Sequence, residues 1–319
     1  MTKPTPPLSI AEPTIQGHTV PSDRVGSLSP FSGDATDHQQ LAAALAEDGY
    51  VFLRGHLDAD LVAAARSEVF RQLAFVGEVG DPPEDGIATG KSRRMDPAED
   101  EGLFWQKVSE GPVLRRLTHG LELQTTLDHA LGEPARGFDL IYLRPTPVGR
   151  ATALHYDYPF FAGSAQPMIN AWIPVGDIPV EDGPLVIVEG SHRFSDLVDQ
   201  FLAVDYATDR SNDVVQQAAY GGAANINPVQ LVTDRETRLL TADFQIGDLL
   251  LVSMFALHGS LDNVSTQNRV RLSCDVRFQP AAFPADDSRY FGEYPTGSKG
   301  GGYADMRGAQ PLVAESPAS

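Results

Sequence analysis

The sequence predicts a mainly β protein, in which a double-sheet jelly roll or barrel carries helices packed on one face. Two observations lead to this fold class. Helical periodicity is concentrated in residues 37–131, whereas short strand-like runs separated by turns recur from residue 138 onward. The chain of 319 residues, 42% of them hydrophobic, is long enough to bury a sizeable core in one such domain.

The net charge of the protein argues against some classes of binding partner. The chain has 24 Lys and Arg against 43 Asp and Glu, a formal net charge of −19, which argues against nucleic acid and anionic membrane surfaces. No apolar run approaches the roughly 20 residues of a membrane span. The Pro/Thr-rich residues 1–8 lack the apolar region of a signal peptide. We therefore expect a cytoplasmic protein, and its oligomeric state stays open.

The single cysteine restricts the metal chemistry. Cys274 alone excludes an internal disulfide framework and a Cys-based zinc site. Any bound metal must therefore use His and carboxylate ligands.

The N-terminal region divides into an arm and a helical layer. Residues 1–36 are rich in Pro, Ser, Thr and Gly without periodicity and predict a loose arm. A helix is predicted over 38–48, with Gly49 as its C-cap, and a short strand over 50–53. The next helix begins after Asp58 or Asp60.

Two further segments precede the β region. Residues 77–102 are dominated by Gly, Pro and charge, and predict a long irregular insert that is either a lid or disordered. A helix is predicted over 110–131, where Leu recurs at helical spacing, and Gly132 ends it.

Strand-like runs then recur to the end of the core. They define a single domain over 37–285, with the jelly-roll core at about 138–280 and an acidic, Gly/Ala-rich insertion at about 195–227. Residues 286–319 are left as a C-terminal tail. The runs cover 138–143, 151–158, 167–175, 184–189, 229–232, 238–241, 248–257 and 268–278.

His155 and Asp157 form an H-x-D pair on the second of these runs. Side chains alternate along a strand, so both point to the same face with Cα atoms roughly 6–7 Å apart. An imidazole and a carboxylate at that spacing can hold a metal ion from one side. The alternative is a hydrogen-bonded polar pair, and only a third ligand from elsewhere decides between them.

His258 is the third ligand that the fold favours. It lies at the far end of the run over 248–257, directly after its last residue, and a jelly roll brings non-sequential strands side by side. His192 follows a strand directly and is better explained as a hydrogen-bonding turn residue. Two imidazoles and one carboxylate form the facial triad of non-haem Fe(II) oxygenases, which leaves coordination positions open.

The last run, over 268–278, alternates in character. Its even positions are apolar or cysteine and should face the packed outer layer, whereas its odd positions begin with Arg269 and Arg271 and should face a polar interior. A buried guanidinium requires an anion, and a carboxylate matches it in bidentate geometry. For Arg271 and Arg277 we favour a salt bridge to an acidic side chain of the protein.

Together these residues resemble the Fe(II)/2-oxoglutarate-dependent oxygenases, specifically the phytanoyl-CoA dioxygenase-like family that includes ectoine hydroxylases. In that family the arginine that binds 2-oxoglutarate follows the distal histidine by eleven positions, and His258 and Arg269 have the same spacing. The resemblance spans roughly residues 40–280, and Glu189 departs from the proline that the family usually has there. Other matching segments are Trp172-Ile173-Pro174-Val175, Asp182-Gly183-Pro184-Leu185, Gly190-Ser191-His192, Gly247-Asp248 and His258-Gly259-Ser260.

The resemblance implies a double-stranded β-helix, or cupin-like, core in which the His155–Asp157–His258 triad binds Fe(II). Arg269 would pair with the distal carboxylate of 2-oxoglutarate, assisted by the Ser260 hydroxyl. Tyr142 and Trp172 are further cosubstrate or pocket candidates, and each is equally consistent with a place in the core.

The implied reaction is hydroxylation of an unactivated C–H bond of a small molecule with O2. Decarboxylation of 2-oxoglutarate to succinate and CO2 accompanies it. Related halogenases have a small residue in place of the carboxylate, so Asp157 argues against halogenation. Desaturation, epoxidation and cyclisation stay open as outcomes.

The substrate itself is not encoded in any motif. The composition suits a tailoring step on a bacterial natural product. Lys91, Arg93 and Arg94 either meet an anionic substrate group or belong to a solvated lid. The aromatic run that includes Tyr156, Tyr158, Phe160 and Phe161 supplies core and pocket residues. A protein of a different class, a jelly roll whose metal is structural or absent, would not need Arg269.

Overall fold

A six-stranded sheet forms the centre of the protein in the computed structural model, which describes residues 12–94, 100–162, 167–206, 208–220 and 227–313. The strand order is β4-β10-β7-β12-β5, and β6 also pairs with β12. All of these pairings are antiparallel. The strands are β4 (Tyr50–Leu53), β5 (Ala135–Gly137), β6 (Tyr142–Thr146), β7 (Ile169–Pro174), β10 (Leu249–Ser253) and β12 (Arg271–Pro280).

A second sheet faces the first and closes the barrel. Its order is β11-β8-β9-β3, from β3 (Val25–Ser27), β8 (Leu185–Val188), β9 (Leu239–Thr241) and β11 (His258–Ser260). An isolated antiparallel bridge between His155 and His258 extends this sheet by one further segment. From β7 onward the chain passes back and forth between the sheets, because β7, β10 and β12 lie in the first sheet and β8, β9 and β11 in the second. The predicted jelly-roll fold class is therefore confirmed.

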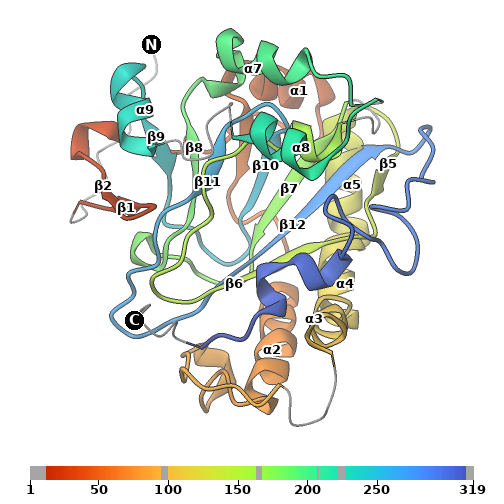
Figure 1. Ribbon diagram of the computed structural model, residues 1–319. Helices are drawn as coiled ribbons and strands as arrows, with labels where there is room; N and C mark the ends of the chain where they lie inside the picture. Colours follow the sequence, from red (N-terminus) through yellow and green to blue (C-terminus); the bar gives the residue numbers. More distant parts are fainter. Residues whose placement is uncertain (1–11, 95–99, 163–166, 207, 221–226, 314–319) are drawn as a thin grey trace.

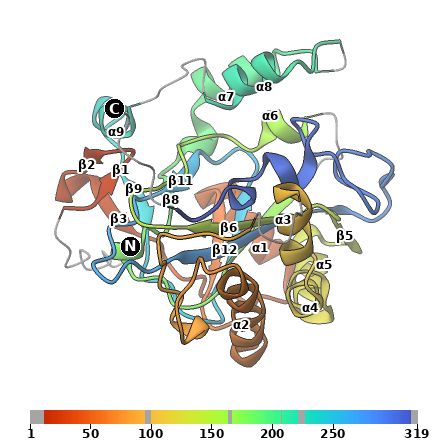
Figure 2. The same ribbon diagram turned by 60° about the horizontal axis from the view of Figure 1, so that its bottom comes forward.

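Helices from the N-terminal half cover the outer face of the six-stranded sheet (Figures 1 and 2). The side chain of Asp37 caps the first of them by accepting the N–H groups of Gln39 and Gln40, and Gly49 ends it at φ 81°. Asp58 caps the second in the same way. These helices are α1 (His38–Asp48), α2 (Ala59–Phe75), α4 (Pro112–His119) and α5 (Leu121–Leu131), joined by α3 (Glu101–Ser109).

Three expectations about elements were wrong. The helix predicted over 110–131 is interrupted at Gly120, whose ψ of 168° is extended rather than helical. Residues 229–232, predicted as a strand, lie in helix α9 (Pro228–Asp234), which Asn227 caps. The strand predicted over 138–143 also lies later, at β6.

Strand β12 separates the hydrophobic core from the polar interior of the barrel. Its even residues, among them Leu272, Cys274 and Val276, are buried against the helical layer. Its odd residues face inward and are equally buried. The alternation predicted for this strand is therefore present.

The regions at both ends of the chain pack against this core. Ile15 and Val20, from the hairpin of β1 (Thr14–Ile15) and β2 (His18–Thr19), are buried, as are Tyr290 and Tyr303 in the segment after residue 285. Figure 2 shows the insertion on the side of the barrel away from α2 and α4. The insertion contains α7 (Ser195–Leu202) and α8 (Asn212–Ala219), and α6 (Tyr158–Phe161) precedes it.

None of the described helices combines the length and apolar character needed to cross a bilayer.

Candidate metal centre

The structure brings His155, Asp157 and His258 together inside the barrel. One ligand atom from each lies within 4.8 Å of the others. Nε2 of His155 is 3.5 Å from Oδ1 of Asp157, and Nε2 of His258 is 3.9 Å from Oδ2. The backbone bridge between the two histidines supplies this proximity, because it places residues 103 apart in sequence directly opposite each other.

Both imidazoles are oriented by the backbone. Nδ1 of His155 lies 2.9 Å from the carbonyl of Ala153, and Nδ1 of His258 lies 3.0 Å from that of Ala256. A carbonyl oxygen only accepts, so each Nδ1 carries a proton and each Nε2 faces the centre of the triad. This is how the outer partners of metal-binding histidines fix the tautomer.

Asp157 is held as a carboxylate. Burial alone would raise its pKa, but the Arg277 guanidinium and the two imidazoles hold that pKa well below its usual range. Nη2 of Arg277 donates to Oδ2 at 2.7 Å, and Nδ2 of Asn170 donates to the same oxygen at 3.1 Å. Oδ1 is thereby left toward His155.

The donor set fits a divalent iron. Burial, followed by the neighbouring His155, lowers the pKa of His258 to about 4, so this imidazole is neutral and able to bind a metal. Two imidazole nitrogens and one carboxylate oxygen on one side of a site are the ligands of the non-haem Fe(II) facial triad.

A cavity of about 320 Å³ opens beside the triad, within the size range of small-molecule sites. His155 and Asp157 form part of its wall. Much of the remainder comes from β6, from Tyr220 at the end of α8, and from residues 297–307 of the C-terminal segment. No motif in the sequence pointed to the contribution of this last segment.

Arg269 and Ser260 lie away from this cavity wall. Nη1 of Arg269 is 3.3 Å from Oδ2 of Asp182 and Nη2 donates to Gln267, with 29% of the side chain exposed. The Oγ of Ser260 accepts the N–H of Thr152 at 2.8 Å. Their proposed role toward 2-oxoglutarate stays a prediction.

Arg271 differs from the expectation of a salt bridge. It is 2% exposed, and its hydrogen bonds go to hydroxyls, from Nη2 to Thr146 at 2.7 Å and from Nη1 to Ser273 at 3.0 Å. Its Nε has no partner among the described residues. Arg277, by contrast, forms the acidic pair that we favoured.

Of the two pocket candidates Tyr142 and Trp172, the first lies at the cavity and the second lies in the core. Tyr142 lines the cavity, and its ring lies 4.7 Å from the Arg277 guanidinium. Trp172 is 1% exposed and packs on Phe244 between the two sheets, with ring centroids 4.7 Å apart. Of the aromatic run, Phe160 and Phe161 line the cavity.

The cationic residues Lys91, Arg93 and Arg94 of the irregular insert do not line the triad cavity. Arg94 is 1% exposed, donates to Glu78 at 2.8 Å and also binds the carbonyls of Gly308 and Ala309. It therefore joins the insert to the C-terminal segment. Lys91 and Arg93 are exposed, and no described residue of the insert lines the triad cavity.

Sequence comparison agrees with this geometry. The family model described as phytanoyl-CoA dioxygenase (PhyH) matches residues 45–271. A relative from Streptomyces exfoliatus, 1-deoxypentalenic acid 11-beta-hydroxylase, is 29% identical over 258 residues, covering 77% of this chain and 82% of the relative. The enzyme of the same name from Streptomyces arenae is 28% identical over the same length.

Solved structures share the fold. The 2-oxoglutarate-dependent carbocyclase SnoK from nogalamycin biosynthesis superposes with a TM-score of 0.51 at 18% identity, covering 91% of this chain and 97% of that one. The epimerase SnoN, solved with Fe3+, alpha-ketoglutarate and nogalamycin RO, gives 0.50 at 23% identity, covering 88% and 95%. The chain belongs to the phytanoyl-CoA dioxygenase (PhyH) family and is an Fe(II)- and 2-oxoglutarate-dependent dioxygenase.

Proposed function

We propose that this dioxygenase hydroxylates an unactivated C–H bond of a small molecule bound in the triad cavity. The observation that carries the proposal is a facial set of two imidazoles and one carboxylate, of which His155 and Asp157 line a ligand-sized cavity. One substrate C–H, one O2 and one 2-oxoglutarate would give the alcohol, succinate and CO2. Bound Fe(II) would supply the activation of O2.

The triad residues have separate tasks in this proposal. His155, Asp157 and His258 would hold the metal, and Arg277 and Asn170 would keep Asp157 bound through one oxygen. A carboxylate at residue 157 fills the position that a halide would need, which supports oxygen transfer over halogenation. Desaturation, epoxidation and cyclisation remain alternative outcomes, because they differ only in how the substrate is placed.

Two arginines compete as the anchor for 2-oxoglutarate. Arg269 has the family spacing, whereas Arg271 is the buried one and has two hydroxyls beside its guanidinium. A buried guanidinium with an unpaired N–H needs an anionic acceptor, and this favours Arg271 as the second candidate. Ser260 is proposed as an assisting hydroxyl in either case.

The substrate class is proposed from the relatives. The Streptomyces enzymes are named for hydroxylating 1-deoxypentalenic acid, and their similarity supports a tailoring step in the biosynthesis of a natural product. We propose a compact, largely apolar metabolite as the substrate.

The test begins without a substrate. Anaerobic addition of Fe(II) and 2-oxoglutarate should give a visible charge-transfer band, which should be absent in His258→Ala and retained in His192→Ala. A jelly roll with a structural metal would give no such band. Screening small apolar metabolites, 1-deoxypentalenic acid among them, should then give a product heavier by one oxygen, with succinate in equal amount.

The anchor is assigned with two matched variants. Arg269→Ala and Arg271→Ala are compared by titrating the charge-transfer band with 2-oxoglutarate. The variant that lacks the anchoring arginine should need at least tenfold more 2-oxoglutarate to reach half of the full band, whereas the other variant should bind 2-oxoglutarate as the wild type does. Unchanged binding in both variants would reject both assignments.

A further inference from the structure

The triad cavity has a charge opposite to that of the whole protein. Over the full chain, Asp and Glu outnumber Lys and Arg by 43 to 24. Along the cavity wall the ratio reverses, with two carboxylates, Asp157 and Asp305, against four cations. The cations are Arg144, Arg277, Lys299 and Arg307.

Arg277 provides buried donors without acceptors. Its side chain is 2% exposed, and Nη2 is used by Asp157. Nε and Nη1 have no hydrogen-bond partner among the described residues. The guanidinium lies 4.7 Å from the ring centroids of both Tyr142 and Phe161. Rings do not replace the missing oxygen acceptors, and leaving buried N–H groups unsatisfied is costly.

Three elements bring further polar groups to the same wall. Arg144 comes from β6 and Arg307 from the C-terminal segment, where it donates to the carbonyl of Ala151. Tyr220 comes from the end of α8, with its ring centroid 6.3 Å from that of His155. Burial raises the pKa of Tyr220, and the positive charges of Arg144 and Arg307 partly oppose this rise. Both arginines therefore lie near the Tyr220 hydroxyl.

The cofactors do not neutralise this excess. Fe(II) brings two positive charges and 2-oxoglutarate two negative charges, so their binding leaves the net charge of the site unchanged. Asp275 pairs with Arg144 behind the wall and so offsets one of the positive charges of the site. The two buried donors of Arg277 that have no partner among the described residues can then be met by an anionic group of a third molecule.

We propose that the substrate carries an anionic oxygen group, a carboxylate or a phosphate, which Arg307 and Lys299 hold at the wall of the triad cavity beside Arg277. This inference rests on the function proposed above and specifies its substrate class. Tyr142, Phe160 and Phe161 supply the apolar part of the wall, where the hydrocarbon part of the substrate would lie. The anionic end would then orient the molecule relative to the metal.

The experiment measures binding to the anaerobic complex with Fe(II) and 2-oxoglutarate, from the shift in its charge-transfer band. The probes are adamantane-1-carboxylate, cyclododecanecarboxylate, the methyl esters of both acids, and the phosphate monoester of adamantane-1-methanol. At least one anion should bind tenfold or more tightly than its neutral counterpart, and this preference should weaken between 50 and 500 mM NaCl. Comparing the carboxylates with the phosphate monoester shows which of the two anionic groups the site prefers.

Four variants test the residues. Arg307→Gln and Lys299→Gln should each weaken anion binding about three- to tenfold and leave ester binding unchanged, whereas Asp305→Asn should strengthen anion binding. Arg71→Gln, an exposed cation on α2 away from the cavity, is the matched control and should change nothing.

The outcomes are separable. Anions that bind no better than their neutral counterparts, including the absence of binding by either, would overturn the inference while leaving the dioxygenase intact. Equal losses for anions and esters in Arg307→Gln would overturn it as well. Failure of the charge-transfer band to form at all would reject the proposed function instead.

Discussion

Arg277 and the candidate metal ligand Asp157 form an ion pair of 2.7 Å in which each side chain is only 2% exposed. The carboxylate therefore lies between a fixed cation on one side and the two imidazoles on the other. With iron bound, it would serve two positive charges at once, the guanidinium through Oδ2 and the metal through Oδ1. Protein stability and metal binding should therefore be coupled through this residue.

Replacing Arg277 with Met should expose that coupling. Removing one partner of a buried ion pair leaves an uncompensated charge, at a cost of about 3–5 kcal/mol. Added Co(II) should recover part of this loss, because it supplies another cation to Asp157. Urea unfolding with EDTA and with Co(II) measures both effects. Arg71→Met, which breaks an exposed pair with Glu84, should cost at most about 1 kcal/mol, and an equal loss in the two variants would refute the coupling.

The triad variants His155→Ala, Asp157→Ala and His258→Ala should each abolish the increase in melting temperature produced by Co(II) or Ni(II). Each removes one of only three protein ligands. Differential scanning fluorimetry with and without metal is sufficient to show this. His192→Ala is the control, because His192 bonds the carbonyl of Ala46 outside the site. A wild-type response in any triad variant would remove that residue from the ligand set.

Gly308→Ala should loosen the C-terminal segment. A Cβ at this glycine would lie 2.0 Å from the ring of Trp105, and Trp105 is fully buried, so neither side can move easily. We expect a loss of about 1–3 kcal/mol and faster proteolysis after residue 285. At Gly80 a Cβ would meet only ordinary contacts of 3.7 Å or more, so Gly80→Ala serves as the comparison. Equal stability of the two variants would count against tight packing of the segment.

His119 should contribute a pH dependence to stability. Burial, then the nearby Arg115, lowers its pKa in the folded state. Below about pH 6.5, the unfolded chain takes up a proton that the folded chain refuses. Stability should therefore fall as the pH drops below about 6.5, by at most about 1.4 kcal/mol per pH unit from this group. His119→Gln should show a weaker decline than the wild type between pH 7.5 and 5 in urea unfolding, and an identical decline in the two proteins would contradict the prediction.

Local rules predicted a large part of this fold. The cap residues Asp37 and Gly49 mark the ends of α1, and the alternation in β12 identifies its inward and outward faces. Both signals depend on neighbours in sequence. The triad was predictable for a different reason, because the spacing from His258 to Arg269 is a family property rather than a consequence of local geometry.

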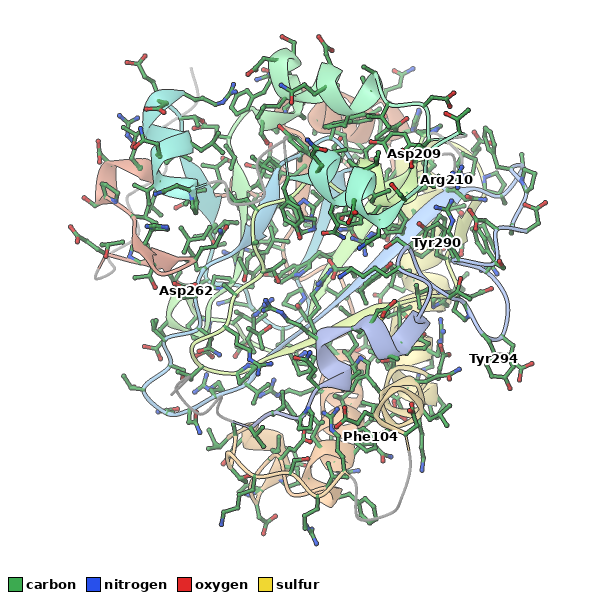
Figure 3. The ribbon with its side chains drawn as sticks, viewed as in Figure 1. Phe104, Asp209, Arg210, Asp262, Tyr290 and Tyr294 are labelled. Atoms are coloured by element: carbon green, nitrogen blue, oxygen red, sulfur yellow. The ribbon has the colours of Figure 1, made fainter. Side chains whose placement is uncertain are left out.

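The predictions failed at positions whose structure depends on contacts with residues far away in the sequence. Arg94 resembles a surface cation in sequence, and only folding shows that Glu78 and two carbonyls near residue 308 surround it. Residues 229–232 alternate like a strand, but Asn227 and Pro228 begin a helix there. The cavity residues after 285 have no periodicity at all, and their position depends on buried anchors such as Tyr290. Figure 3 shows Tyr290 beside Arg210 of the insertion.

The part of the wall contributed by residues 297–307 lies outside the region that matches the family, which ends at residue 271. Two relatives could therefore share every metal ligand and still accept unrelated molecules, because the sequence that selects the substrate can diverge without altering the catalyst. Exchanging this segment between relatives offers a route to new specificities in which the iron chemistry is inherited unchanged.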